Sequence, residues 1–234
     1  MSDYYELKRY QLRNGPQARR LDEFLRELAI PALNLCGVQP VGAFSVLLGD
    51  VTPCVYALLR HRSLDSVVAV RNWLAADAEF QKAAAFFREA PATDPPFVRM
   101  ESSLLLAFEG MPELEVPLEA QGNRPRIFEL RRYESHSEAA LKTKIEMFNG
   151  AEIAIFRRTG LQPVFFGETL IGARQPNLTY LLTFESMAAR ERSWAAFRED
   201  PEWRKLWSTP GLTDPEIVSN VTSILLRPAP YSQI

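Results

Sequence analysis

The chain repeats itself at a constant offset of 123 residues. The segment YELKRY at 5–10 aligns with FELRRY at 128–133, GVQPV at 37–41 with GLQPV at 160–164, and DAEFQK at 77–82 with DPEWRK at 200–205. A single offset kept over most of each half indicates one structural unit used twice. We predict a first repeat in residues 1–110, a linker rich in Pro, Gly and Glu in 111–125, and a second repeat in 126–234.

Composition excludes several classes of protein. The 27 basic and 29 acidic residues give a net charge of −2, which does not favour nucleic-acid binding. With 47% hydrophobic and 24% charged residues the chain has the composition of a folded globular protein. The two cysteines, Cys36 and Cys54, are too few for a disulfide scaffold and lack zinc-site spacing. We expect a protein that binds no nucleic acid and has reduced cysteines.

One uncharged stretch, 28–49, is long enough to cross a bilayer. It contains Pro31 and Pro40, which would remove amide donors from a helix in lipid, so we predict a helix end, a turn and a strand instead of a membrane span. The opening residues have neither the basic nor the apolar region of a secretory signal. These features together favour a cytoplasmic location.

Each half shows the same order of predicted elements. A strand centred on Leu7 or Leu130 is followed by a helix, two strands, an interrupted helix and a final strand. The predicted helices cover 21–35 and 141–155 and then begin near Ser63 and Ser186; the remaining strands are 41–48, 54–60, 100–108, 164–171, 178–184 and 218–226. This order, βαββαβ twice, predicts an α+β protein with tandem ferredoxin-like repeats whose two sheets cover each other.

Local signals predict how several helices begin and end. Ser135 and Glu138 have the spacing of a capping box, and Gly37 and Gly160 follow helices where a left-handed residue is typical. Asp200 followed by Pro201 predicts a helix break with Asp200 as the cap of a new helical piece.

The second half resembles the NIPSNAP family. The resemblance rests on FELRRY at 128–133, GETLIG at 167–172, PNLTY at 176–180 and DPEW at 200–203. It implies the dimeric α+β barrel superfamily, whose members include cofactor-free monooxygenases, haem-binding dismutases and proteins without an assigned role. The first half is a degenerate copy: Ser45, Cys54 and Ala78 stand where the second half has Glu168, Asn177 and Pro201.

Polar residues alternate with leucine on the first strand of each repeat. If Leu7 and Leu130 face the helices, then Glu6, Lys8 and Tyr10, and likewise Glu129, Arg131 and Tyr133, face the barrel interior. One interpretation is a buried structural network of paired charges. The other is the polar end of a small-molecule pocket, with Tyr133 and Tyr180 as aromatic walls.

Few residues have the surroundings expected of a catalytic group. Glu168 lies on a predicted strand beside Phe166 and is either a general base or half of an ion pair with Arg131 or Arg174. His61 and His136 lack a second ligand at metal spacing, and His136 is the candidate haem ligand only by default. The sequence has no nucleophile elbow, P-loop or dinucleotide fingerprint. We therefore predict neither a metal nor a cofactor.

Two functions remain open. The first is binding or transformation of a small, partly apolar molecule in the barrel interior, at a site formed by Arg131, Tyr133, Glu168 and Tyr180 on the inner sheet face of the second repeat, with a weaker site or none in the first. The second is a scaffold whose barrel is filled by its own side chains and whose outer helices bind partners. The tryptophans 194, 203 and 207 are expected to pack on the sheet or at a subunit contact, which would make a homo-oligomer.

Overall fold

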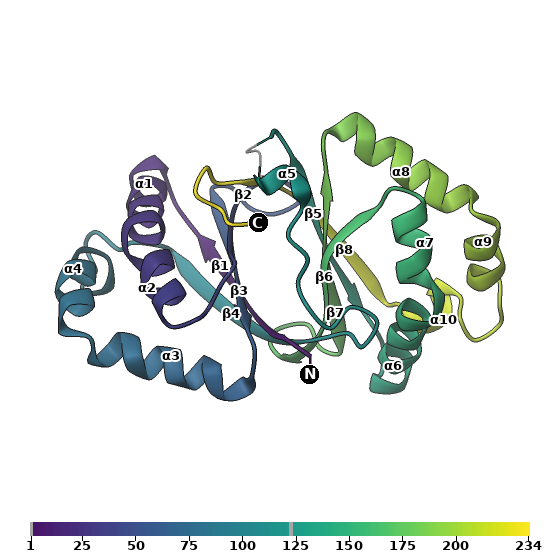
Figure 1. Cartoon of the computed structure of the whole chain (residues 1–234), viewed down its shortest axis with the longest axis horizontal. Helices are drawn as coiled ribbons and strands as arrows, with labels where there is room; N and C mark the ends of the chain where they lie inside the picture. Colours follow the sequence, from purple (N-terminus) through teal and green to yellow (C-terminus); the bar gives the residue numbers. More distant parts are fainter. Residues whose placement is uncertain (1, 122–123) are drawn as a thin grey trace.

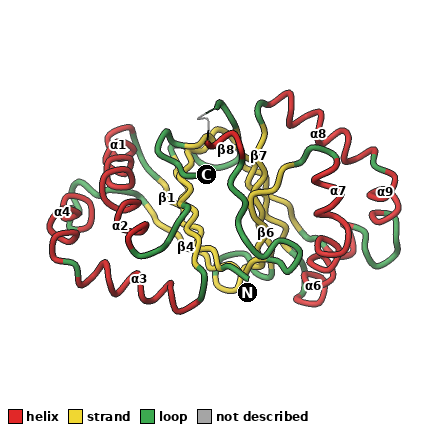
Figure 2. Tube along the Cα trace, viewed as in Figure 1, coloured by secondary structure: helices red, strands yellow, loops and turns green. Residues whose placement is uncertain are grey.

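Eight strands form one closed barrel with helices on its two flanks. The computed structural model describes residues 2–121 and 124–234. Figure 1 shows helices α1 to α4 on one side of the strands and α6 to α9 on the other, and the same separation is visible in the trace of Figure 2. The predicted α+β architecture of tandem ferredoxin-like repeats is confirmed.

The two repeats contain equivalent elements in the same order. The first has β1 (Tyr4–Gln11), α1 (Gly15–Glu23), η1 (Phe24–Ala29), α2 (Ile30–Leu35), β2 (Val41–Leu48), β3 (Cys54–His61), α3 (Leu64–Ala76), α4 (Ala78–Arg88) and β4 (Arg99–Ala107). A short helix, α5 (Leu118–Gln121), lies between the repeats. The second has β5 (Ile127–Glu134), α6 (Glu138–Met147), η2 (Phe148–Glu152), α7 (Ile153–Arg158), β6 (Gln162–Ile171), β7 (Asn177–Phe184), α8 (Met187–Glu199), α9 (Pro201–Trp207), α10 (Asp214–Ile217) and β8 (Asn220–Pro228).

The strand order around the barrel is β1-β3-β2-β8-β5-β7-β6-β4. Each repeat contributes four neighbouring strands with its first strand between its third and fourth, which is the ferredoxin-like order. Antiparallel pairing of β2 with β8 and of β4 with β6 joins the two sheets. The barrel therefore closes within one chain through two equivalent seams.

Apolar side chains fill the barrel interior. One buried cluster takes members from all eight strands and none from the flanking helices, so it lies inside the barrel. Its aromatic members Tyr5, Phe44, Phe128 and Phe165 are all at most 1% exposed, and Tyr56 is 2% exposed. Leu114 and the C-terminal Ile234 join the same cluster. Side chains thus occupy much of the interior, as the second of the two functions above expects, and ligand binding inside the barrel stays a prediction.

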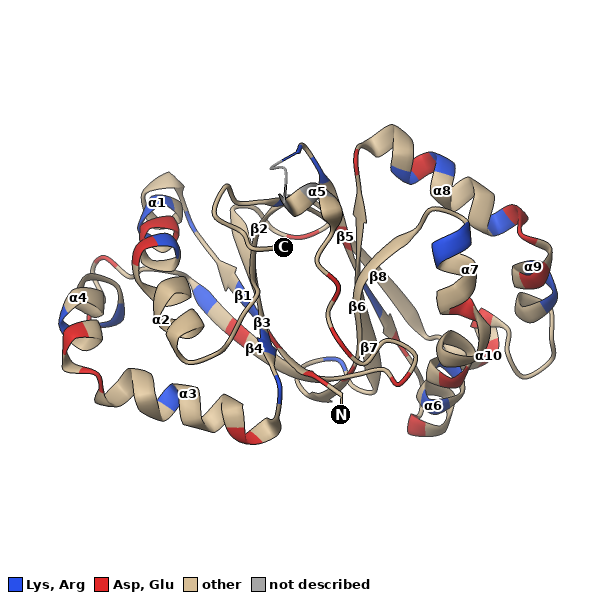
Figure 3. Cartoon of the chain, in the orientation of Figure 1, with Lys and Arg blue, Asp and Glu red and all other residues tan. Residues whose placement is uncertain are grey.

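The expected orientation of the first strands is wrong. Leu7 and Leu130 belong to the interior cluster, whereas Tyr10 and Tyr133 belong to the clusters formed with the helices. Glu6 and Glu129 alternate with these leucines and therefore face the helices as well. Charged pairs also occur on the Leu7 side of the strands, where Arg9 binds Asp50 at 2.7 Å, but Glu129 lies on the side of α8, from which Arg190 and Trp194 reach it. Figure 3 shows charged positions in the strands as well as on the helices.

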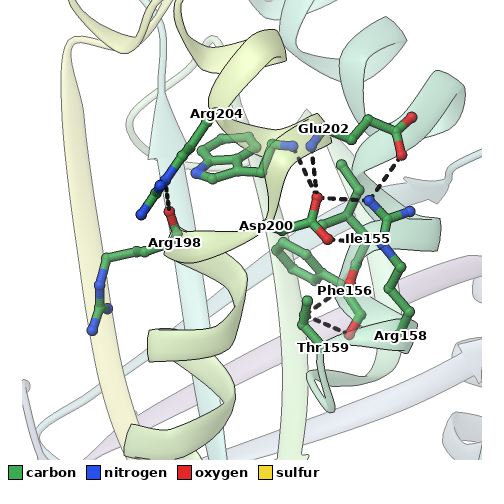
Figure 4. Close-up of polar contacts among 9 residues, drawn as sticks. Ile155, Phe156, Arg158, Thr159, Arg198, Asp200, Glu202 and Arg204 are labelled. Atoms are coloured by element: carbon green, nitrogen blue, oxygen red, sulfur yellow. Dashed lines mark hydrogen bonds and ion pairs between the residues drawn. The ribbon is translucent and has the colours of Figure 1, made fainter.

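Most local signals are confirmed. Gly37 and Gly160 have φ values of 78° and 83° directly after helices. Asp200 caps α9 by accepting hydrogen bonds from the backbone N–H groups of Glu202 and Trp203, at 3.0 and 3.1 Å, and Figure 4 shows this corner. The predicted capping box at Ser135 is wrong. Ser137 caps α6 instead, because its hydroxyl accepts from Ala140, while Ser135 is buried in the preceding turn.

The first helix of each repeat is interrupted by a π-helical turn, η1 between α1 and α2 and η2 between α6 and α7. The spacing of apolar residues does not predict these turns. No helix among the described residues has the length and apolar character needed to cross a bilayer.

Candidate functional site

A cavity of about 500 Å³ lies between the sheet and the helices of the first repeat. This volume is within the range of small-molecule sites. Apolar side chains from several helices and loops form most of the wall, among them Phe24, Leu33, Phe87 and Phe97. Strands β1, β3 and β4 contribute a polar group of four residues, namely Glu6, Lys8, His61 and Ser102. The cavity thus combines a mostly apolar wall, to which Arg71 and Arg88 of the helices also belong, with a polar floor on the strands.

Differences between the repeats explain why this space is open. Ala57 stands where the second repeat has Tyr180, and Leu33 where it has Phe156. The ring of Tyr180 packs against Phe156 at 5.8 Å and against Phe166 at 5.2 Å between ring centroids. The second repeat therefore fills with aromatic rings the layer that smaller side chains leave open in the first.

Glu6 is the centre of the polar floor. Its Oε1 atom lies 2.7 Å from Lys8 Nζ and accepts a hydrogen bond from the Ser102 hydroxyl at 2.6 Å. Its Oε2 atom lies 4.0 Å from His61 Nε2. That nitrogen is buried and has no hydrogen-bond partner among the described residues, while Nδ1 is 2.9 Å from the Ser66 hydroxyl. Glu6 and His61 consequently present free polar atoms side by side.

The charge states of the pair follow from their surroundings. Burial opposes ionisation of Glu6, but Lys8 and Ser102 outweigh it, so the pKa of Glu6 lies below its usual value. Burial also lowers the pKa of His61, against the opposite influence of Glu6. At neutral pH the floor therefore holds an ionised carboxylate and a neutral imidazole.

The equivalent carboxylate of the second repeat has no free atom. Glu129 accepts hydrogen bonds from Arg190, Arg131, Trp194 and Ser223, at 2.6 to 3.0 Å, and is completely buried. Burial raises its pKa, but the two arginines and the hydrogen bonds outweigh burial and hold the pKa at about 2. Both carboxylate oxygens of Glu129 are thus occupied by hydrogen bonds, as expected for a buried structural network. Glu6 is not fully occupied in this way.

The four residues predicted as a ligand site lie on the helix-facing side of the second sheet, not on the inner face. Arg131 donates to the Tyr133 hydroxyl at 3.1 Å, and Tyr180 donates to the same hydroxyl at 3.2 Å. Glu168 is half-buried and lines a different cavity, of about 940 Å³, beside α6. Neither expected ion pair of Glu168 forms, because Arg131 pairs with Glu129 and Arg174 with Glu134. Use of these four residues in ligand binding stays a prediction.

The position of His61 on the cavity wall was not predicted from the sequence, although a signal existed. His61 stands where the second repeat has Phe184, so it is a polar replacement at a core position. His136, in contrast, is exposed before α6. Within residues 2–121 and 124–234 no group of three or more His, Cys, Asp or Glu side chains is arranged to hold a metal ion.

Comparison with known proteins agrees with this architecture. The chain aligns with a protein from Lactobacillus acidophilus named as a candidate monooxygenase at 6% identity and TM-score 0.62, covering 97% of this chain and 94% of that one. It aligns with an anthrone oxidase-like protein at 10% identity and TM-score 0.58, covering 98% and 92%. These likenesses show the fold, which is that of the dimeric α+β barrel proteins.

The particular family follows from the sequence. The NIPSNAP family model matches residues 5–109 and again 128–233, so the chain belongs to the NIPSNAP family and contains its domain twice. An uncharacterized NIPSNAP-like domain protein from Burkholderia xenovorans is 22% identical, with TM-score 0.40, and covers 44% of this chain and 85% of its own. No curated protein matches the chain.

Proposed function

We propose that the first repeat binds a small, partly apolar molecule between its sheet and helices and transfers a proton to or from it with Glu6 and His61. One observation carries the proposal: His61 Nε2 is buried, has no hydrogen-bond partner in the described part of the chain and lies 4.0 Å from the Glu6 carboxylate on the wall of the cavity. A buried polar atom without a partner is costly, and a ligand oxygen between the two groups would satisfy both.

The two groups have complementary roles. The ionised Glu6 carboxylate accepts a proton from a ligand hydroxyl or from an acidic C–H beside a carbonyl. The neutral His61 imidazole binds the ligand oxygen through Nε2, while the Ser66 hydroxyl holds Nδ1 and can accept from it or donate to it in either tautomer. Lys8 keeps the carboxylate charged before the transfer and compensates that charge. The ligand class is a planar or aliphatic hydroxyl or carbonyl compound that fits about 500 Å³.

Binding is tested with two matched substitutions on α2, one at a residue that lines the cavity and one at an exposed residue. Leu33 lines the cavity, whereas Leu35 is 81% exposed on the same helix. Leu33→Phe introduces the residue type of Phe156 and should fill the cavity, while Leu35→Phe should not. A thermal-shift screen of naphthols and aryl ketones should therefore find compounds that stabilise the wild type and Leu35→Phe but not Leu33→Phe.

Proton transfer is tested separately by solvent deuterium exchange into a bound ketone, followed by NMR. Glu6→Gln and His61→Phe should bind the apolar part of the ketone and lose exchange at least tenfold. Exchange that persists in Glu6→Gln overturns the acid–base role. Equal binding by Leu33→Phe and Leu35→Phe, or no binding to the wild type, overturns the cavity as a ligand site and favours the scaffold function that the filled barrel permits.

A further inference from the structure

The second repeat has a separate groove on its outer surface, of about 760 Å³, beside α8 and α9. We name it the arginine–tryptophan groove, after seven of the residues that line it, namely Arg131, Arg190, Arg198, Arg204, Trp194, Trp203 and Trp207. It does not share residues with the cavity of the first repeat. Its chemistry is therefore independent of the function proposed above.

Positive charge is in excess in this groove. Arg131 and Arg190 share a single carboxylate, that of Glu129. Arg198 and Arg204 form no ion pair among the described residues, and the one hydrogen bond of Arg204 goes to the Arg198 carbonyl at 3.2 Å. Figure 4 shows both of these side chains extending to the same side of the α8–α9 corner, away from Arg158 and Asp200.

The acidic residues in the groove do not balance these arginines. Glu191 and Asp214 also line it, but Asp214 already faces Lys144 at 3.5 Å. At the floor, the Arg131 Nε atom is buried and has no hydrogen-bond partner among the described residues. A ligand carboxylate would supply acceptors for guanidinium groups that now lack them.

Flat aromatic surfaces accompany the charge. Trp207 is 49% exposed at the rim, and Trp203 is half-buried against Phe197 with ring centroids 4.4 Å apart. Arg131 lies over the Trp194 ring at 4.6 Å, which shows that guanidinium and indole already stack at the floor. Indole rings beside unpaired guanidinium groups favour a planar ligand that carries negative charge.

The first repeat lacks this combination. Ala75 stands where the second repeat has Arg198, Gln81 where it has Arg204, and Ala84 where it has Trp207. The groove is thus not a general consequence of the ferredoxin-like unit but a property of the second repeat. We propose that it binds a planar organic anion, with the carboxylate held by Arg198 and Arg204 and the ring placed against Trp203 and Trp207.

The probes are 2-naphthoate and its neutral counterpart 2-naphthamide, measured by isothermal titration calorimetry and tryptophan fluorescence on the full chain. We expect 2-naphthoate to bind at least tenfold more tightly than the amide, and to weaken as salt is added. The double variant Arg198→Gln/Arg204→Gln should lose at least tenfold in affinity for 2-naphthoate. Trp207→Ala should weaken both probes.

Arg192→Gln is the matched control, since Arg192 is exposed on α8 but does not line the groove. It should bind 2-naphthoate as the wild type does, and circular dichroism should show all variants folded. Equal affinity for acid and amide, an unchanged affinity in the double variant, or no binding at millimolar 2-naphthoate each overturns the proposal.

Discussion

Ala57 and Tyr180 occupy equivalent places in the two repeats, each paired across the sheet with the basic residue of the first strand, Lys8 or Arg131. The alanine leaves space above the sheet and the tyrosine occupies it. Leu33 and Phe156 differ in the same way. The space between sheet and helices is therefore open in the first repeat and filled in the second, although the two repeats have similar folds.

The cap at the α8–α9 corner predicts the cost of losing Asp200. Asp200→Ala should lower the free energy of unfolding by about 0.5–2 kcal/mol, because two backbone N–H groups of α9 lose their acceptor. Asp200→Asn is the control that keeps the cap but removes the charge facing Arg158. Urea denaturation should rank the wild type above Asn and Asn above Ala. An unchanged midpoint for Ala would contradict the cap.

The fully hydrogen-bonded carboxylate of Glu129, which Arg190 and Trp194 of α8 contact, should be essential for stability. Glu129→Gln keeps the size of the side chain but leaves Arg131 and Arg190 without their anion. We expect a loss of about 1.5–3 kcal/mol in chemical denaturation, the range for hydrogen bonds to charged groups. Glu101→Gln, at an exposed position on β4, should change stability little. Equal midpoints for the two variants would refute the structural role.

Glu129 should also contribute to acid sensitivity. Its pKa is about 2 in the folded protein and near 4.5 when exposed, so the folded state favours the ionised form. The resulting stabilisation is complete above about pH 5 and is lost as the pH falls through 4.5 towards 2. Between pH 6 and pH 2.5 the free energy of unfolding, measured by chemical denaturation, should fall less for Glu129→Gln than for the wild type. Parallel curves would contradict the assignment.

The buried ion pair of Lys144 and Glu152, at 3.3 Å, predicts strong coupling between these positions. The first repeat has Leu21 and Ala29 there. Lys144→Leu alone should cost about 3–5 kcal/mol because it leaves Glu152 buried without its partner. Adding Glu152→Ala should recover part of that loss. A double-mutant cycle with no coupling energy would show that the pair does not act as a unit.

Gly49 allows close approach of the backbone at the seam between β2 and β8. Its φ is 97°, and an added Cβ would lie 2.3 Å from the Ser223 carbonyl oxygen. Gly37 has a φ of 78° with open space around it. Both Gly→Ala changes carry the strain of a left-handed residue, about 1–2 kcal/mol, but Gly49→Ala must also displace backbone of β8. Thermal melts should therefore place Gly49→Ala well below Gly37→Ala, and the reverse order would be inconsistent with this seam.

The sequence predicts the repeat, the order of its elements and the caps at Gly37, Gly160 and Asp200, because each rests on short-range pattern. It does not predict which face of the first strand lies inside the barrel. Alternation separates Leu130 from Glu129 and Arg131 into two sets, but the choice between faces depends on what Arg190 and Trp194 can reach from α8.

The candidate site is harder to predict because a cavity results from packing between distant segments. Leu33, Ala57 and His61 look like ordinary core residues until they are compared with Phe156, Tyr180 and Phe184 of the second repeat. These differences between the repeats are visible in the sequence and mark the first repeat as the one with the smaller side chains.

Closure of the barrel within one chain also affects how such a protein can change over time. In a pair of identical subunits, every substitution would occur on both sides of the barrel, so a residue that opened one layer would open the other. Here the seams β2–β8 and β4–β6 join two segments that mutate independently. One repeat can retain the Glu129 hydrogen-bond network and its filled aromatic layer, while the other carries Ala57 and His61 at the positions of Tyr180 and Phe184.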